Sequence, residues 1–352
     1  MMEMGRITEG KPVTIYDIAK EAGVSPATVS RVLTNNARVR PEKKERILRL
    51  FEKYNFTPNA MARGLADTRS RTIGMIAADV RNPFYAELFA SCELAARQYG
   101  YTILLYNFLR ETEIEKMYLQ KLQEQRVDVV IQMGGKVDDL VSDPEYVEMV
   151  NALPGRMPMV VTGKLDGTQC YQVQIDAMKS MDLLMEHLLG LGHREIALVG
   201  GRIDVLSTFE KVQRYKQILR RNQITFRPEL VQEDGTYDDA GAYERMSGML
   251  DRGIVPTAVI AINDFSAAGI ARSIWEHGYR IPEDISLVSY DNTYITEVMM
   301  PKLTSIDYNY ENFGRQLVET AIHAIEGKEV PRLQMLEPVL VVRGSSGPVK
   351  KG

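Results

Sequence analysis

The sequence is poor in the features that mark disulfide-rich, zinc-binding and membrane proteins. Among its 352 residues are only two cysteines, Cys92 and Cys170, which are too few and too far apart for a disulfide framework or a zinc site. No run of about 18 apolar residues is present, so no membrane span is expected. The first residues, MMEMGRITEGKP, lack the apolar stretch of a secretory signal. We therefore expect a cytoplasmic protein with reduced thiols.

Catalytic and cofactor motifs are missing as well. The sequence contains no GxSxG, no HExxH, no Walker A motif and no GxGxxG. Its four histidines stand apart without metal-ligand spacing: His187, His193, His277 and His323. We therefore expect no enzyme, no metal and no cofactor. Acid–base chemistry by carboxylates stays an alternative, which turnover of a ligand would reveal.

Charge is distributed unevenly along the chain. The formal net charge of −4 argues by itself against a nucleic-acid partner. Residues 1–70, however, hold 13 Lys and Arg against 8 Asp and Glu, whereas the remainder holds 30 against 39. A basic head on an acidic body is typical of a DNA-binding module joined to a regulatory one, although an excess of five also fits an ordinary solvated surface. The length suggests two or three domains.

Near the N-terminus, two short helices with a sharp corner between them are predicted from residues 13–36, VTIYDIAKEAGVSPATVSRVLTNN. Thr14 can cap the first helix, with Asp17 three residues later completing a capping-box-like pair. Gly23 gives the backbone freedom for the turn, and Ser25 followed by proline begins the second helix. Helices this short need a partner, because they are not stable alone in water.

Residues 41–54, PEKKERILRLFEKY, supply that partner as a third helix with an apolar face. The three helices form a helix-turn-helix unit whose second helix can lie in the major groove of DNA. Such a shape alone is a weak signal, because small helical pairs with a glycine corner also occur as plain structure.

The segment that follows, NAMARGLADTRSRTIG, makes the pattern specific. With it, the chain resembles the lactose-repressor (LacI/GalR) family of bacterial transcription regulators. The residues that carry the resemblance are Thr14, Asp17, Ala19, Ala22, Gly23, Val24, Ser25, Thr28, Val29, Ser30, Arg31, Val32, Pro58, Asn59, Ala62, Arg63, Leu65 and Ala66. The resemblance extends to about Arg343. It implies a helix-turn-helix domain at 11–57, a hinge helix at 58–70 and an effector-binding and dimerisation core at 71–345.

The resemblance also implies a homodimer that binds a pseudo-palindromic operator in double-stranded DNA. Polar side chains of the helix-turn-helix can donate to phosphates, and Arg31 can reach the O6 and N7 acceptors of guanine, although it also fits a solvated surface charge. Pro26 and Ala27 would offer van der Waals contact, for example to a thymine methyl. The expected DNA-binding residues are Thr14, Tyr16, Ser25, Pro26, Ala27, Thr28, Ser30, Arg31, Asn59, Ala62 and Leu65.

Residues 59–66 are too few for a stable isolated helix, so a flexible linker is the plain interpretation. In the resembling family this segment is a hinge helix that orders on DNA. Leu65 then matches the side chain that enters the minor groove, partly unstacks the bases and bends the duplex.

Beyond residue 71, apolar runs of strand length alternate with helical stretches, which predicts buried parallel sheet of the doubly wound α/β kind. The resemblance implies two subdomains of periplasmic-binding-protein type with a cleft between them. We place the first at about 71–168 with 296–327, and the second at about 169–295 with 328–345.

Polar and aromatic residues follow several of these strands, where ligands bind in doubly wound sheets. Any single Asp or Asn there also suits a turn or a helix cap. Resemblance and position together predict a cleft for a small polar effector, a sugar or sugar derivative. The expected effector-binding residues are Asp79, Asn82, Phe84, Tyr85, Asp176, Lys211, Arg214, Tyr237, Asn263, Asp291 and Tyr310.

The cleft departs from the family pattern in the segment STFEKVQRYKQIL. Lys211 stands where the family has an arginine that grips the effector, and Arg214 stands where glycine is usual. Lysine is a point charge rather than a planar fork, so Lys211 favours an anionic ligand such as a sugar acid or phosphate, and equally permits a site that has lost its ligand. A helix displaced by one turn would let Arg214 take the missing role. Ser180 and Ser289 also replace usual glycines.

The sequence therefore predicts a DNA-binding repressor of carbohydrate uptake or catabolism genes, controlled by an effector in the cleft. The alternative is a DNA binder of the same fold without a sugar effector, either constitutive or controlled by a partner. A solute-binding protein or an enzyme is less favoured.

Overall fold

The computed structural model describes residues 13–33, 39–56, 69–155, 157–232 and 236–350. The chain divides into two compact units, one ending at Arg71 and the other beginning at Thr72. Asn59, Ala62 and Leu65 of the expected hinge lie outside the described residues.

The first unit is a three-helix bundle made of α1 (Ile15–Ala22), α2 (Pro26–Leu33) and α3 (Pro41–Lys53). Its core is apolar, with Ile18, Val29 and Ile47 fully buried. The predicted capping box is present, because the backbone N–H of Thr14 donates to Asp17 at 2.9 Å and the N–H of Asp17 donates back to the threonine hydroxyl. Gly23 ends α1 in the left-handed region, with φ of +63°. The helix-turn-helix prediction is thus confirmed.

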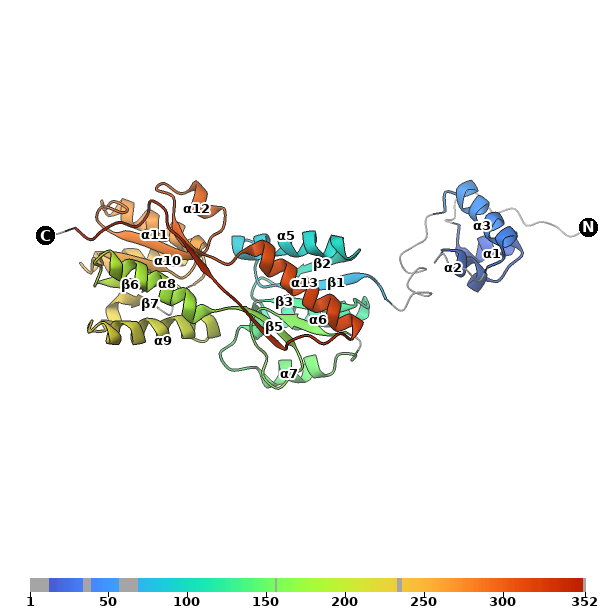
Figure 1. Cartoon of the computed structure of the whole chain (residues 1–352), viewed down its shortest axis with the longest axis horizontal. Helices are drawn as coiled ribbons and strands as arrows, with labels where there is room; N and C mark the ends of the chain where they lie inside the picture. Colours follow the sequence, from blue (N-terminus) through green and yellow to red (C-terminus); the bar gives the residue numbers. More distant parts are fainter. Residues whose placement is uncertain (1–12, 34–38, 57–68, 156, 233–235, 351–352) are drawn as a thin grey trace, which may run out of the picture. The chain divides into compact units, whose positions relative to one another are not determined.

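The second unit contains two six-stranded sheets with helices packed around each (Figure 1). The first sheet is parallel throughout, in the order β11-β5-β4-β3-β1-β2. Its strands are β1 (Thr72–Ala77), β2 (Thr102–Asn107), β3 (Val129–Met133), β4 (Met159–Val161), β5 (Tyr171–Ile175) and β11 (Leu333–Leu336). Its helices are α5 (Pro83–Gln98), α6 (Thr112–Glu124), α7 (Pro144–Asn151) and α13 (Tyr310–Glu326).

The second sheet has the order β12-β10-β9-β8-β6-β7, and only the pair of β10 with β12 is antiparallel. Its strands are β6 (Ile196–Val199), β7 (Val231–Gln232), β8 (Ala258–Ala261), β9 (Ser286–Asp291), β10 (Thr304–Asp307) and β12 (Val339–Val341). Its helices are α8 (Ala177–Gly190), α9 (Leu206–Arg221), α10 (Asp239–Asp251), α11 (Asp264–Glu276) and the short α12 (Ile295–Val298). The two predicted doubly wound subdomains are confirmed.

The expected subdomain boundaries are wrong in detail. Strand β5 belongs to the first sheet, β10 to the second and β11 to the first, so the chain crosses after Ile175, after Asp307 and after Leu336. Strand β11 lies at the edge of its sheet with β5 beside it, and most residues of both are only partly buried or exposed, so neither shows the continuous apolar run by which central strands are recognised. Helix α13 packs closely on α5. A Cβ added at Gly314 would lie 2.7 Å from the backbone nitrogen of Cys92, so glycine is needed at this contact.

No helix among the described residues is both long and apolar enough to cross a membrane. Within the same residues, no group of three or more His, Cys, Asp or Glu side chains is placed to hold a metal ion.

Candidate functional site

The outer surface of α2 carries most of the residues expected to contact DNA. Ser25, Pro26, Ala27 and Arg31 are exposed, while Thr28 and Ser30 are partly buried. Tyr16 on α1 is 71% exposed. The structure therefore presents these side chains on the face of the unit that its core does not use. Their contacts to DNA stay a prediction.

The start of α2 is held by its own side chains. The hydroxyl of Ser25 accepts the backbone N–H of Thr28 at 3.2 Å and lies 2.9 Å from the hydroxyl of that residue. This is the expected N-cap. Because Pro26 has no N–H and the N–H groups of Thr28 and Val29 bond to Ser25, the first turn leaves the N–H of Ala27 for another acceptor. A helix N-terminus of this kind favours phosphate oxygens. Thr14 donates its hydroxyl to Asp17 at 2.6 Å, so its first role is to cap α1.

Helix α3 is tied to α1 by charge. The ammonium group of Lys53 lies 2.7 Å from a carboxylate oxygen of Glu21, and the hydroxyl of Tyr54 donates to the other oxygen at 2.6 Å. These bonds hold the pKa of Glu21 below its usual range.

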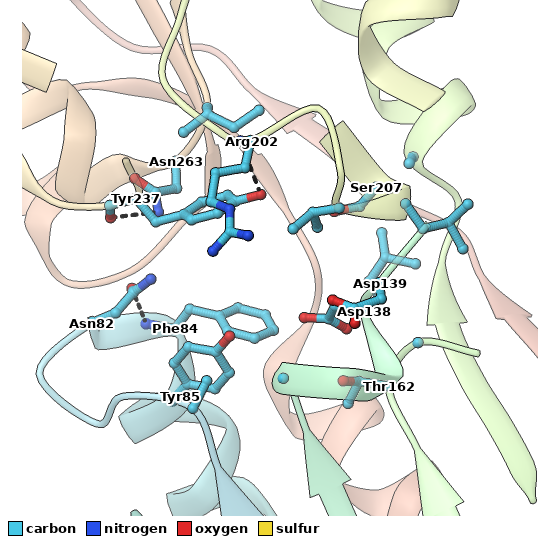
Figure 2. Close-up of a pocket in the computed structure, with 18 of the residues that line it drawn as sticks. Asn82, Phe84, Tyr85, Asp138, Asp139, Thr162, Arg202, Ser207, Tyr237 and Asn263 are labelled. Atoms are coloured by element: carbon cyan, nitrogen blue, oxygen red, sulfur yellow. Dashed lines mark hydrogen bonds between the residues drawn. The ribbon is translucent and has the colours of Figure 1, made fainter. Parts of the chain in front are cut away.

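The second candidate site is a cavity of about 310 Å³ between the two sheets of the core (Figure 2). Its walls come from both subdomains, at the carboxyl ends of their parallel strands, as the rule for doubly wound sheets requires. Seven of the expected effector-binding residues line it: Asn82, Phe84, Tyr85, Lys211, Tyr237, Asn263 and Asp291.

The wall from the first subdomain is largely aromatic. Asn82 caps α5 by accepting the backbone N–H of Phe84 at 3.1 Å. The ring of Phe84 meets that of Tyr85 edge-on, with centroids 5.0 Å apart, and that of Tyr308 at 6.2 Å. Apolar ring faces beside a few fixed polar groups are typical of small-molecule sites.

The opposite wall is organised by Tyr237. Its hydroxyl lies 2.7 Å from that of Thr208, and its backbone carbonyl accepts the side-chain N–H of Asn263 at 3.1 Å. Asn263 also caps α11 by accepting the N–H of Ser266 at 2.7 Å, so the cap and the cavity use the same residue. The guanidinium of Arg110 lies 5.7 Å from the ring centroid of Tyr237, from the other subdomain.

Lys211 and Asp291 are buried groups of opposite charge. The ammonium of Lys211 lies 3.8 Å from the ring centroid of Tyr290. Burial lowers the pKa of Lys211 and raises that of Asp291, and the attraction between the two groups opposes both shifts. Lys211 therefore lies over a ring face in a buried position, and no ion pair joins it to a carboxylate among the described residues. An anionic ligand at Lys211 stays a prediction.

Four expected effector-binding residues are not in the cavity lining. The carboxylate of Asp79 accepts two N–H groups of the Arg81 guanidinium, from Nε at 2.9 Å and from Nη2 at 2.7 Å, which lowers the pKa of Asp79. Asp176 caps α8 through the N–H of Lys179 at 2.8 Å. Asp79 and Asp176 therefore stabilise a turn and a helix start, which is the alternative role of such residues.

The other two are engaged in packing. Arg214 forms a two-pronged pair with Asp182 on α8, at 2.6 and 2.7 Å, so it does not replace the missing arginine of the cleft. The ring of Tyr310 lies 6.0 Å from that of Phe84, and its buried hydroxyl has no hydrogen-bond partner among the described residues.

Several lining residues were not predicted from the sequence. They are Arg110, Glu115, Asp138, Asp139, Thr162, Gln174, Arg202 and Glu210. Asp138 lies five residues after the end of β3, so the rule about strand ends could have found it. Arg110 gave no signal, because it lies in an irregular turn with φ of +63°.

Glu115 is a buried carboxyl beside the cavity. It accepts the side-chain N–H of Gln132 at 2.5 Å and the backbone N–H of Lys136 at 2.9 Å. The other end of Gln132 accepts the hydroxyl of Tyr146 at 2.6 Å. Burial raises the pKa of Glu115 more than these hydrogen bonds lower it, so the pKa is about 7.

Asp264 orders the loop after β9. Its carboxylate accepts hydroxyls of Ser289 and Ser305, the latter at 2.8 Å, and the backbone N–H of Thr293 at 2.6 Å. This explains a serine at 289 in place of the expected glycine. The network fixes the backbone that carries Asp291 into the cavity.

The comparisons with known proteins follow the same division of the chain. Residues 14–59 match the model of the bacterial regulatory proteins, lacI family, and residues 185–346 match the periplasmic binding protein-like domain. Catabolite control protein A of Priestia megaterium is 34% identical over 297 residues, which cover 84% of this chain and 87% of the relative.

Solved structures give the same result. The lac repressor dimer bound to operator and the anti-inducer ONPF superimposes with a TM-score of 0.83 at 29% identity, over 96% of this chain and 100% of that one. The complex of the transcriptional regulator CelR with cellobiose gives a TM-score of 0.70 at 26% identity, over 95% and 99% of the two chains.

Proposed function

Because the chain belongs to the lacI family of bacterial regulatory proteins, we propose that it represses genes of carbohydrate uptake or catabolism under the control of a small polar effector. The observation that carries the proposal is the pairing of a DNA-type recognition helix with a two-walled cavity in one chain. The α2 surface supplies the DNA contacts, and the cavity supplies the regulatory site.

DNA recognition rests on the exposed residues of α2. Arg31 can donate to a guanine edge, and Pro26 with Ala27 can contact a thymine methyl. The relative bound to operator is a dimer, and a two-fold dimer reads two half-sites of a pseudo-palindrome. We propose the same arrangement for this chain.

Exposed apolar side chains on and beside α12 support a homodimer. Tyr294, Val298 and Met300 are 59%, 70% and 78% exposed, although each is apolar or largely so. Neighbouring exposed apolar residues often mark an interaction surface, because water solvates them poorly.

Effector control rests on the cavity. Its volume falls at the lower end of the roughly 300–1,000 Å³ that small-molecule sites occupy. The similar CelR is known in complex with cellobiose, and the cavity offers the same kinds of groups that bind sugars, namely aromatic faces, amides and carboxylates. A ligand there would touch both subdomains, and it changes the balance between their open and closed arrangements to the extent that it binds one of them more tightly.

One observation favours the alternative of a DNA binder without a sugar effector. Two backbone hydrogen bonds already join the subdomains across the cleft, from Leu140 to Asp204 at 2.7 Å and from Leu206 to Asp138 at 2.8 Å. A core that closes on itself needs no ligand to adopt that arrangement.

The test of DNA recognition is selection of binding sites from random DNA by the full-length protein at fixed salt. We expect an inverted repeat to be enriched, with two half-sites of the same sequence. Binding that is equally tight on all DNA would contradict the proposal. Affinity must be compared at one salt concentration, because phosphate contacts make it salt-dependent.

A further inference from the structure

The carboxylate of Asp138 lines the cavity and accepts no hydrogen bond from another described residue. Among the described residues, no hydrogen bond or ion pair reaches its side chain. The neighbouring carboxylates of the same lining differ, because Asp139 lies 3.1 Å from the ammonium of Lys136, and Glu115 accepts two N–H groups. Figure 2 shows Asp138 pointing into the space beside the ring of Phe84.

The backbone of Asp138 is fixed on both sides. Its N–H donates to the carbonyl of Gly135 at 2.9 Å, and its carbonyl accepts the N–H of Leu206 at 2.8 Å. Room for the side chain comes from Gly163, where an added Cβ would lie 2.7 Å from the carboxylate oxygen. The position of the carboxylate is thus set by its surroundings rather than by a partner.

Four cations line the cavity in the described part of the chain, and none of them makes an ion pair with Asp138. Arg110 lies 5.7 Å from the ring centroid of Tyr237 and has no carboxylate partner among the described residues. Lys136 is shared between Asp139 and Asp143, at 3.1 and 3.0 Å, and Arg202 donates to Asp204 at 3.0 Å. Lys211 lies over the ring of Tyr290. None of these groups neutralises Asp138, and burial raises its pKa to about 7.

Above about pH 7, where it is mostly ionised, this partly buried carboxylate favours hydrogen-bond donors and disfavours anions. Ligand hydroxyl or amino hydrogens would satisfy its oxygens, and bonds to an ionised group are among the strong ones. A ligand carboxylate or phosphate at the same place would set like charges together in a medium that screens them poorly.

We propose that Asp138 determines the ligand specificity of the cleft, by accepting hydrogen bonds from a neutral or amino-bearing sugar and excluding sugars that carry a carboxylate or phosphate there. The inference rests on the proposed function, in which this cleft binds an effector. It reverses the expectation of an anionic ligand that Lys211 suggested.

The experiment measures binding to the full-length protein by calorimetry with five probes: glucose, cellobiose, glucosamine, gluconate and glucose 6-phosphate. We expect binding by at least one of the first three and roughly tenfold or weaker binding by the two anions. Asp138→Asn should lower the affinity for the neutral or amino-bearing ligand by roughly 10- to 100-fold, since a hydrogen bond to a charged acceptor is lost.

Asp166→Asn is the matched control. It removes the same charge from an exposed carboxylate of the same subdomain, which is paired with Lys164 at 2.7 Å and lies outside the cavity lining. We expect it to leave the ratio between neutral and anionic ligands nearly unchanged. Wild-type-like folding of both variants is checked by thermal unfolding.

Three outcomes decide the matter. Tight binding of gluconate or glucose 6-phosphate, or equal effects of the two variants, would overturn the role of Asp138 while leaving effector control intact. Binding by none of the five probes would overturn both the role of Asp138 and the effector part of the proposed function. Operator recognition is tested separately and would stand.

Discussion

The backbone N–H of Leu206 donates to the carbonyl oxygen of Asp138 across the cleft, at 2.8 Å. Leu206 is the first residue of α9 in the second subdomain, whereas Asp138 follows β3 in the first. Together with the bond from Leu140 to Asp204 and the β-bridge between Asp139 and Val205, it forms a main-chain latch. A ligand that changes the closure of the cleft must act on this latch.

Leu206→Pro should weaken the latch without breaking α9. Proline lacks the N–H donor, but it is tolerated at the first position of a helix. The preceding Val205 already has the extended conformation that proline requires, with φ of −97° and ψ of 127°. We expect a more open core by small-angle X-ray scattering and weaker binding of any cleft ligand, with a loss of about 1 kcal/mol in the closed state.

Leu206→Ala is the control for that experiment, because it shortens the side chain and keeps the N–H. If both variants behave alike, the side chain rather than the latch is responsible, and the latch has no role in closure.

Arg31→Ala should relax sequence specificity. We expect a loss of about 1–3 kcal/mol at one base pair per half-site, because a guanine would lose its donor. The measurement is a titration of the selected operator and of its single-base variants. Arg49→Ala removes the same charge from an exposed position on α3, beside Glu45, and should leave the specificity profile unchanged. Equal losses on every sequence for Arg31→Ala would mean that this residue contacts phosphate instead.

Glu115→Gln should change the pH dependence of stability. The pKa of Glu115 is raised to about 7 by burial, above its ordinary value of 4.5, so between these pH values the folded state holds more protons than the unfolded state. Its favourable contribution is therefore complete below about pH 4.5 and is lost as the pH rises through 7.

Urea unfolding of wild type and Glu115→Gln from pH 5 to 8 measures this difference. We expect the variant to gain stability relative to wild type as the pH rises, by about 3 kcal/mol at most over the full range. The comparison between the two proteins cancels other titrating groups. A difference that is independent of pH would show that Glu115 titrates normally.

Leu65→Ala tests the expected minor-groove wedge. Leu65 lies outside the described residues, so its role stays a prediction. We expect weaker binding to the operator and a smaller bend in the DNA, with weak binding to random DNA almost unaffected. Gel-shift phasing measures the bend, and an unchanged bend would remove Leu65 from this role.

Local chemistry explains which parts of the fold could be predicted. The capping box at Thr14 and the turn at Gly23 depend on neighbours within a few residues, so the sequence carries them directly. Central strands such as β3 and β8 are buried on both faces, and their continuous apolar runs mark them. The edge strand β11 and its neighbour β5 lack that signal, because most of their residues are only partly buried or exposed, and the subdomain boundaries were misplaced with them.

The sequence predicted the cleft residues that follow a strand and also cap the next helix, as Asn82 and Asn263 do. The same pattern failed for Asp176, because a cap on its own satisfies the carboxylate without a ligand. Arg214 was misplaced since its partner Asp182 lies on another helix, a contact that sequence spacing does not reveal. Asp138 follows a strand, so its place near the cleft could have been predicted, but the space for its carboxylate is left by Gly163, which is a tertiary feature.

The most direct test of the account is an operator titration at fixed salt, with and without a saturating ligand of the cleft. The account predicts that the ligand changes operator affinity by roughly 5- to 150-fold, in either direction, and that Leu206→Pro reduces this coupling. A ligand that binds the cleft tightly and leaves operator affinity unchanged would contradict it.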